Sequence, residues 1–126
     1  MPFLLKSEPE KYSFDDLVRD RETTWDGIKN PQALLTLRNL KKGDKLVLYH
    51  SNTGKVAVGT ATVVSVDPVD PKNPIVRIQA GKPLMRPKTL AEMRDAPVFA
   101  GSLLFRQFRL SVVPLTDEQY DWLLTP

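Results

Sequence analysis

The chain has 126 residues, 41% of them hydrophobic and 26% charged, which suits one globular domain spanning residues 1–126. It contains no cysteine, and this excludes disulfides and thiolate metal sites. The formal net charge is +3, and the first apolar run, residues 3–5, is too short for a signal peptide or a membrane span. We therefore expect a cytoplasmic protein.

The positive charge is concentrated in one segment. Residues 82–109 carry six cationic and two acidic side chains, a net charge of +4, while the rest of the chain is close to neutral. A phosphate-contacting surface requires such a segment, although a solvated surface that is basic by chance explains it equally well. The residues that we expect to contact a nucleic-acid backbone are Arg86, Lys88, Arg106 and Arg109.

The N-terminal part of the chain predicts a strand and a helix. Residues 3–5 form the expected strand, which runs out into the polar loop Lys6-Ser7-Glu8-Pro9 because proline stops ladder pairing. Ser13 precedes two acidic residues, and this pattern predicts a capped short helix over residues 13–18.

Residues 25–32 predict a binding loop. Gly27 can take a positive φ angle, Asn30 is a good N-cap, and Pro31 suits the first helical position. Beside the free N–H groups of a helix start, Trp25 would offer a stacking face to a planar polar ligand. The alternative is that Trp25 fills the core, and for a lone Trp this alternative is the commoner outcome.

A helix and a hairpin follow. Apolar residues recur at helical spacing over residues 33–40, and the helix should end near residues 41–43. Residues 46–50 and 56–66 predict two strands joined by a turn. In the second arm, Gly59 and Ala61 leave room for a ligand or for another strand.

The C-terminal half alternates short strands and helices. The proline-rich residues 67–74 predict an exposed loop before a strand over residues 75–79. Capping boxes at Thr89 and Thr116 predict two helices, and residues 106–113 predict a strand with one apolar face. The expected fold is α+β, a small partly closed β-barrel of about five to six strands with flanking short helices.

The usual catalytic signatures are missing. The chain has no Gly-rich phosphate loop, no Gly-x-Ser-x-Gly turn and no metal-ligand spacing. His50 and Ser51 are adjacent, so on a strand they would point to opposite faces and could not act together as base and nucleophile. We therefore predict no catalytic residue, no metal and no cofactor.

Four segments in order resemble the signature of the EVE domain family, which belongs to the PUA-like superfamily and is related to the YTH readers of methylated adenine. These segments are Lys6-Ser7-Glu8-Pro9, Trp25-Asp26-Gly27-Ile28-Lys29-Asn30, Tyr49-His50-Ser51-Asn52 and Arg106-Gln107-Phe108-Arg109-Leu110-Ser111-Val112. The resemblance spans nearly the whole chain. It implies a PUA-like barrel and a pocket for one flipped, modified nucleobase, a modified cytosine in DNA or a modified base in RNA.

The resemblance also implies a set of ligand-binding residues. By position they are Lys6, Ser7, Trp25, Gly27, Asn30, Tyr49, His50, Ser51 and Ser111. The chemistry of these residues agrees, since a Trp can stack on a base and polar groups can bond to its edges. A wall for a methyl substituent would come from Trp25, Gly59 and Ala61. The implied partner is DNA or RNA carrying a modified base, with no membrane, and a monomer is favoured.

Two other functions compete with the non-catalytic reader. The ASCH family has a related barrel and includes amidohydrolases of acylated cytidine, and Lys6 with Glu8 or Asp26 would imitate their lysine and carboxylate. A lysine acts as a base only when its pKa is lowered by burial or by a neighbouring cation. The second competing function is a small interaction module without a ligand. It would need Trp25 and Ser7 to be buried, with their hydrogen bonds made within the protein.

Overall fold

A computed structural model describes residues 2–25, 31–51, 54–67, 75–106 and 110–126. The strands are β1 (Phe3–Ser7), β2 (Glu22–Trp25), β3 (Lys45–His50), β4 (Val56–Asp67), β5 (Ile75–Thr89) and β6 (Val112–Pro114). The helices are α1 (Phe14–Asp20), α2 (Pro31–Arg38), α3 (Leu90–Asp95), α4 (Leu103–Arg106) and α5 (Asp117–Leu124), with a 3₁₀ turn η1 (Pro97–Phe99).

Local capping chemistry starts three of the helices. Ser13, Thr89 and Thr116 each accept a bond from the backbone N–H three residues later, and that later side chain bonds back to the cap. Helix α2 begins at Pro31 as predicted but ends at Arg38, before the expected residues 41–43. The chain turns towards the sheet there, because Gly43 has a φ of +92° and its amide donates to the Val63 carbonyl.

The strands form one mixed sheet in the order β2-β5-β4-β3-β1-β6. Strands β1 and β3 are parallel, and every other pairing is antiparallel. The edge strands β2 and β6 do not pair with each other, so the sheet is not closed. The predicted α+β class, with six strands and short flanking helices, is confirmed.

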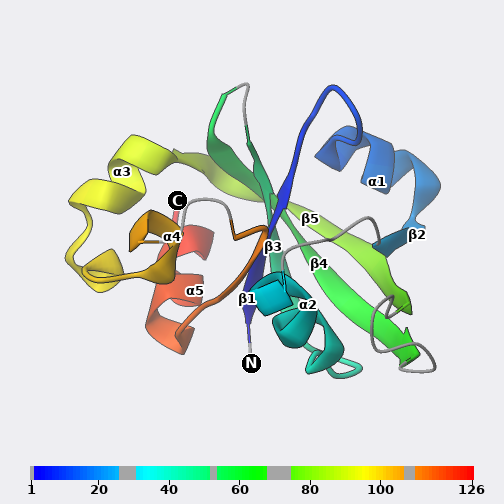
Figure 1. Cartoon of the computed structure of the whole chain (residues 1–126). Coiled ribbons are helices and arrows are strands. Elements are labelled where there is room, and N and C mark those ends of the chain that lie inside the picture. Colours follow the sequence, from blue (N-terminus) through cyan, green and yellow to red (C-terminus); the bar gives the residue numbers. More distant parts are fainter. Residues whose placement is uncertain (1, 26–30, 52–53, 68–74, 107–109) are drawn as a thin grey trace.

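The helices cover different sides of the sheet. Figure 1 shows α3, α4 and α5 together on one side, α1 and β2 on the other, and α2 near the N-terminal end of β1. All six strands contribute buried residues to the core, as do α1 through Leu17, α2 through Leu37 and α3 through Met93. None of the described helices has the length and apolar character needed to cross a membrane.

Three predicted strands differ from the structure. Strand β1 continues through Lys6 and Ser7, which were expected in a loop, and β5 extends to Thr89. The prediction of a strand over residues 106–113 is wrong: Arg106 ends α4, and β6 covers only residues 112–114. The sequence alternation does not persist there, because the consecutive residues Val112 and Val113 are both fully buried. Strand β2 was not predicted.

A bulge changes which residues face inward at one end of the sheet. Leu48 pairs with Gly59 but Tyr49 pairs with Ala57, so β4 has one extra residue between them. On the next strand, Pro83 lies opposite Gly59 and Lys88 opposite Ala57, so residues 84–87 bulge out of the ladder. Lys88, where the pairing resumes, is buried.

Candidate functional site

Parallel pairing of β1 and β3 brings four of the predicted site residues together. Lys6 lies beside Tyr49, and Ser7 lies beside His50, at the carboxyl ends of the two strands. The amide of Ser51 donates to the Ser7 carbonyl at 2.9 Å and continues this pairing. The predicted cluster of strand-end residues therefore exists in the fold.

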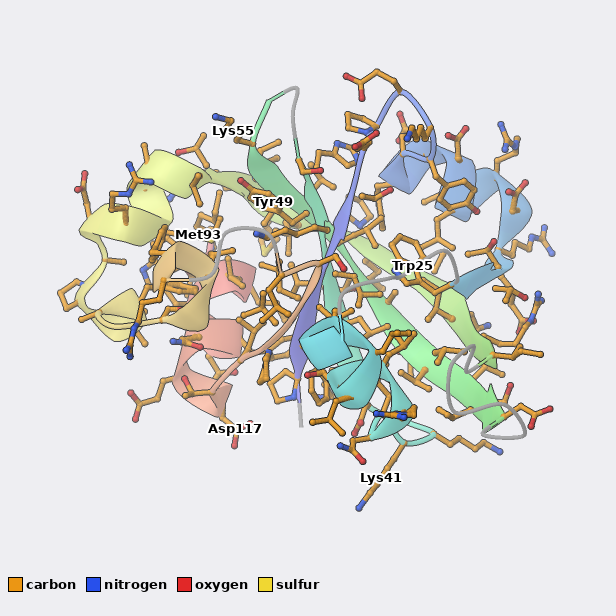
Figure 2. All side chains as sticks on the ribbon, in the orientation of Figure 1. Trp25, Lys41, Tyr49, Lys55, Met93 and Asp117 are labelled. Atoms are coloured by element: carbon orange, nitrogen blue, oxygen red, sulfur yellow. The ribbon has the colours of Figure 1, made fainter. Side chains whose placement is uncertain are left out.

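The strand pleat divides this cluster between two sides of the sheet. Neighbouring residues on a strand point to opposite faces, so Ser7 and His50 point one way and Lys6 and Tyr49 the other. The contacts agree, since Ser7 and His50 bond to the segment that starts α1. Figure 2 shows Tyr49 on the side of Met93 in α3 and Trp25 on the side of α1. We refer to these as the Tyr49 side and the α1 side.

On the α1 side, Ser7 is held by the backbone. Its side chain is only 8% exposed, and its hydroxyl donates to the Tyr12 carbonyl. The hydroxyl proton of Ser7 is thus already used in a hydrogen bond, while the hydroxyl oxygen can still accept one. Ser7 can therefore receive a donor from a ligand but is poorly placed to donate.

His50 has a structural partner on the same side. Its Nε2 accepts the backbone N–H of Phe14 at 3.0 Å, which requires the neutral imidazole with its proton on Nδ1. Burial lowers the pKa of His50, against the weaker opposing effects of Asp15 and Glu10. His50 therefore ties β3 to the first turn of α1, and this leaves only Nδ1–H for a ligand.

Trp25, the last residue of β2, forms one wall of a hollow. It is 9% exposed, and its ring lies edge-on to Tyr12, with centroids 6.3 Å apart and an interplanar angle of 77°. A cavity of about 280 Å³ is lined by these two rings and by Thr23 and Thr24. Trp25 thus belongs to the core and also presents part of its surface to a space of ligand size.

The wall predicted from the hairpin is not open. A Cβ built at Gly59 would overlap the ring of Phe14, so that ring already fills the space next to the glycine. Ala61 is 2% exposed. The prediction that Gly59 and Ala61 leave room for a methyl group is wrong for this structure, and Thr23 and Thr24 supply the small walls instead.

The Tyr49 side is cationic. The Lys6 Nζ lies 6.0 Å from the centroid of the Tyr49 ring, and the Lys6 amide donates to the Ser111 carbonyl at 2.9 Å. Burial lowers the pKa of Lys6 and raises the pKa of Tyr49. Lys6, Tyr49 and the backbone of Ser111 therefore adjoin, as the resemblance implies, but away from the Trp25 hollow.

The structure corrects one of the predicted phosphate contacts. Lys88 is 1% exposed, and its ammonium donates to the carbonyls of Arg86, Leu123 and Thr125. Its Nζ also lies 5.5 Å from the Trp122 ring. Lys88 therefore holds the end of α5 against β5 and has no surface for a phosphate.

The other predicted basic contacts differ in their surroundings. Arg86 is exposed but paired with Glu92, and Arg106 is exposed at the end of α4. Arg109, together with the predicted pocket residues Gly27 and Asn30, lies outside the described residues.

Sequence reasoning missed Tyr12 and the two threonines. A signal for Tyr12 exists, because it immediately precedes the N-cap Ser13, where an apolar residue commonly fixes the entry angle of the chain. Thr23 and Thr24 are β-branched and precede an aromatic, which favours a strand. Over the described part of the chain, no group of three His, Asp or Glu side chains is arranged to hold a metal ion.

The mixed sheet and its short flanking helices define a PUA-like α+β fold, with an aromatic-polar hollow beside Trp25. A sequence profile of the EVE domain matches residues 2–125, and the chain belongs to the EVE domain family. Thymocyte nuclear protein 1 of Gallus gallus is 33% identical over 162 residues, covering 98% of this chain and 67% of that protein.

Solved structures agree with this assignment. Rpa0253 from Rhodopseudomonas palustris superposes with a TM-score of 0.90 at 35% identity, over 98% of this chain and 90% of that one. The human THYN1 protein in complex with 5-methylcytosine-containing DNA gives a TM-score of 0.87 at 29% identity, over 98% and 95%. An ASCH protein from Zymomonas mobilis has a TM-score of 0.69 at 13% identity, over 98% and 96%, and so shares the fold alone.

Proposed function

We propose that this chain is a non-catalytic DNA-binding module. It takes a single flipped cytosine base, such as 5-methylcytosine, into the hollow beside Trp25. The observation that carries the proposal is the similarity to the human THYN1 protein solved with 5-methylcytosine-containing DNA. The chain's own support is the hollow of about 280 Å³ with two aromatic walls and two threonines.

The chemistry of the hollow suits a planar base. A base stacked on an aromatic ring contributes about 1–3 kcal/mol. The threonine hydroxyls that line the hollow supply hydrogen-bonding groups for a base edge. The proposed base contacts, with Tyr12, Thr23 and Thr24 added, are Ser7, Trp25, Gly27, Asn30, His50 and Ser51. The other predicted site residues, Lys6, Tyr49 and Ser111, lie on the Tyr49 side and are proposed to contact the rest of the strand.

Selectivity should be strong between kinds of base and modest between a base and its methylated form. A buried methyl group contributes about 0.8 kcal/mol, which is a few-fold in affinity. A mispaired polar edge costs about 1–3 kcal/mol for each unsatisfied group. The hydrogen-bonding edge therefore chooses the base, and the apolar wall refines the choice.

A titration of single-stranded oligonucleotides tests the proposal. The strands differ at one position, which carries cytosine, methylcytosine, hydroxymethylcytosine, adenine or methyladenine, and RNA strands of the same sequence are included. We expect cytosine bases to bind well above adenine bases, with methylation changing affinity only a few-fold. Equal affinity for cytosine and adenine would refute the polar edge, and preferential binding of the RNA strands would overturn the choice of DNA.

Catalysis is the competing function, and one observation favours it: burial lowers the pKa of Lys6, as a lysine base requires. Its carboxylate partner is less well placed, because Glu8 forms an ion pair with Lys11 at 3.2 Å. Incubating the protein with acylated cytidine, followed by mass spectrometry, decides between the two. Product formation that disappears in Lys6→Met would establish an amidohydrolase. The monomeric state and the cytoplasmic location remain predictions.

A further inference from the structure

Two cations lie over aromatic rings on the Tyr49 side. The Lys6 Nζ is 6.0 Å from the Tyr49 centroid, and the Arg94 guanidinium carbon is 5.4 Å from the Phe105 centroid. Arg106 follows Phe105 at the end of α4 and is exposed. We call Lys6, Tyr49, Arg94, Phe105 and Arg106 the Tyr49 patch. Its cations come from β1, α3 and α4, which only the fold brings to one side.

Three members of this patch, Lys6, Tyr49 and Arg94, lie near one another. The positive charge of Arg94 lowers the pKa of Tyr49, against the larger raising effect of burial, so its field reaches that phenol. Lys6 approaches the face of the same ring. Tyr49 therefore has two cations near it that are far apart in the sequence.

The two arginines of this patch, Arg94 and Arg106, differ from the ion-paired arginines elsewhere in the described chain. Arg86 is paired with Glu92, Arg77 with Glu22, and Arg19 with Asp16 and Asp20. Within the described ranges, no ion pair joins Arg94 or Arg106 to a carboxylate. Asp95, the neighbour of Arg94, contributes one negative charge, and the patch stays net positive.

We propose that Arg94, with Lys6 and Arg106, forms an anion subsite for the phosphodiester backbone of a nucleic-acid strand. The inference rests on the proposed function, because the strand is the one whose base enters the Trp25 hollow. A cation-π contact with Phe105 helps to hold the guanidinium of Arg94, whose fork matches the geometry of a phosphate and can bind it through two hydrogen bonds. Arg94 thereby takes the phosphate-contacting role that the sequence had given to Lys88.

The test measures the affinity of a methylcytosine-containing single strand for the full chain between 50 and 200 mM salt. Each phosphate contact on a single strand contributes about 0.7 to the slope of log affinity against log salt. Arg94→Gln should therefore flatten the slope by about that amount while leaving the order of preference among bases unchanged. Arg94→Lys keeps the charge at the last turn of α3 and should preserve most of the slope.

Lys41→Gln is the matched control. Lys41 is exposed and lies at the lower edge of the molecule in Figure 2, away from Tyr49. Its replacement by Gln removes one positive charge, as Arg94→Gln does. We expect its slope to match that of the parent. If Lys41→Gln and Arg94→Gln flatten the slope equally, net charge explains the effect and the subsite is refuted.

The outcomes separate this inference from the proposed function. If the parent discriminates between bases but Arg94→Gln leaves the slope unchanged, the subsite is wrong and the base reader stands. If no strand binds at any salt concentration, the proposed function fails and the nucleic-acid subsite fails with it. A third outcome is that the protein binds a polyglutamate peptide and no DNA. If Arg94→Gln then weakens the binding of the peptide, the partner of the patch is an acidic protein and the nucleic-acid subsite is wrong.

Discussion

The α1 side and the Tyr49 side of the sheet carry neighbouring residues of the same two strands, yet they differ in the interactions that they can make with a ligand. On the α1 side, Ser7 and His50 are bonded to backbone groups next to an aromatic hollow. On the Tyr49 side, Lys6 and Arg94 present positive charge over aromatic rings. The first side offers shape and hydrogen bonds, and the second offers electrostatic attraction.

One short sequence motif can therefore contribute residues to two surfaces. Lys6-Ser7 and Tyr49-His50 are each a pair of adjacent residues, and the pleat sends the members of each pair to opposite faces. A strand of nucleic acid can therefore be read on one side and held on the other. Substitutions on the two sides should separate base selectivity from salt dependence.

The largest effect is expected for Trp25→Ala. Truncating a buried Trp costs about 3–5 kcal/mol of unfolding free energy, and base binding should be lost with the stacking wall. Trp25 is only 9% exposed and belongs to the core, so its truncation should affect stability as well as binding. Thermal melting measures the first effect and oligonucleotide titration the second.

Trp25→Phe separates the two roles of this residue. The smaller ring should keep the fold and retain the salt slope that we assign to the Tyr49 side, while weakening the binding of the base. A folded Trp25→Phe protein with undiminished affinity, together with an unaffected Tyr12→Leu protein, would move the base site away from this hollow.

Lys88→Met should lower the unfolding free energy by about 1.5–3 kcal/mol, because three backbone carbonyls lose a charged donor. The salt dependence of DNA binding should not change, since the ammonium is buried. Denaturant unfolding and the salt titration are the two measurements. A flattened slope in a folded variant would restore Lys88 to the phosphate contacts.

Gly59→Ala should destabilise the α1 side through overpacking. The added methyl overlaps the Phe14 ring, and such crowding typically costs about 1–3 kcal/mol. The Phe14 amide bonds to His50, so the change should also disturb the strand ends near the hollow. Ala61→Gly is the control that removes a methyl from the same strand. A Gly59→Ala protein as stable as its parent would mean that Phe14 has another place to pack.

The smallest effect concerns pH. Burial lowers the pKa of His50 below its ordinary value of about 6.5, so the folded state prefers the neutral ring. The stability it contributes is complete above pH 6.5 and is lost as the pH falls through the folded pKa, where the Phe14 N–H loses its acceptor. The loss is about 1 kcal/mol, the size of one neutral hydrogen bond.

His50→Gln is the comparison for the pH experiment, because its amide oxygen can accept the same N–H without titrating. Unfolding free energies measured from pH 7.5 to 4.5 should fall more steeply for the parent than for this variant. Parallel curves would show that the imidazole does not carry the acid sensitivity of the α1 side.

Elements governed by neighbouring residues could be predicted from the sequence. The helices after Ser13, Thr89 and Thr116 begin where expected, because a capping box is completed within four residues. The hairpin of β3 and β4 also follows from local turn chemistry and β-branched residues. Motif order likewise identified the family.

The division of the site was decided by the tertiary structure alone. Whether Lys88 meets a phosphate or three carbonyls depends on α5, which follows some 35 residues later and packs over β5. Whether there is free space beside Gly59 depends on where the Phe14 ring of α1 packs. The sequence determined that a Lys, a Tyr and a His would lie near strand ends, since short-range patterns set those ends. The pairing register and the bulge at Tyr49 determined which side each one faces, because a shift of one residue moves a side chain to the other face.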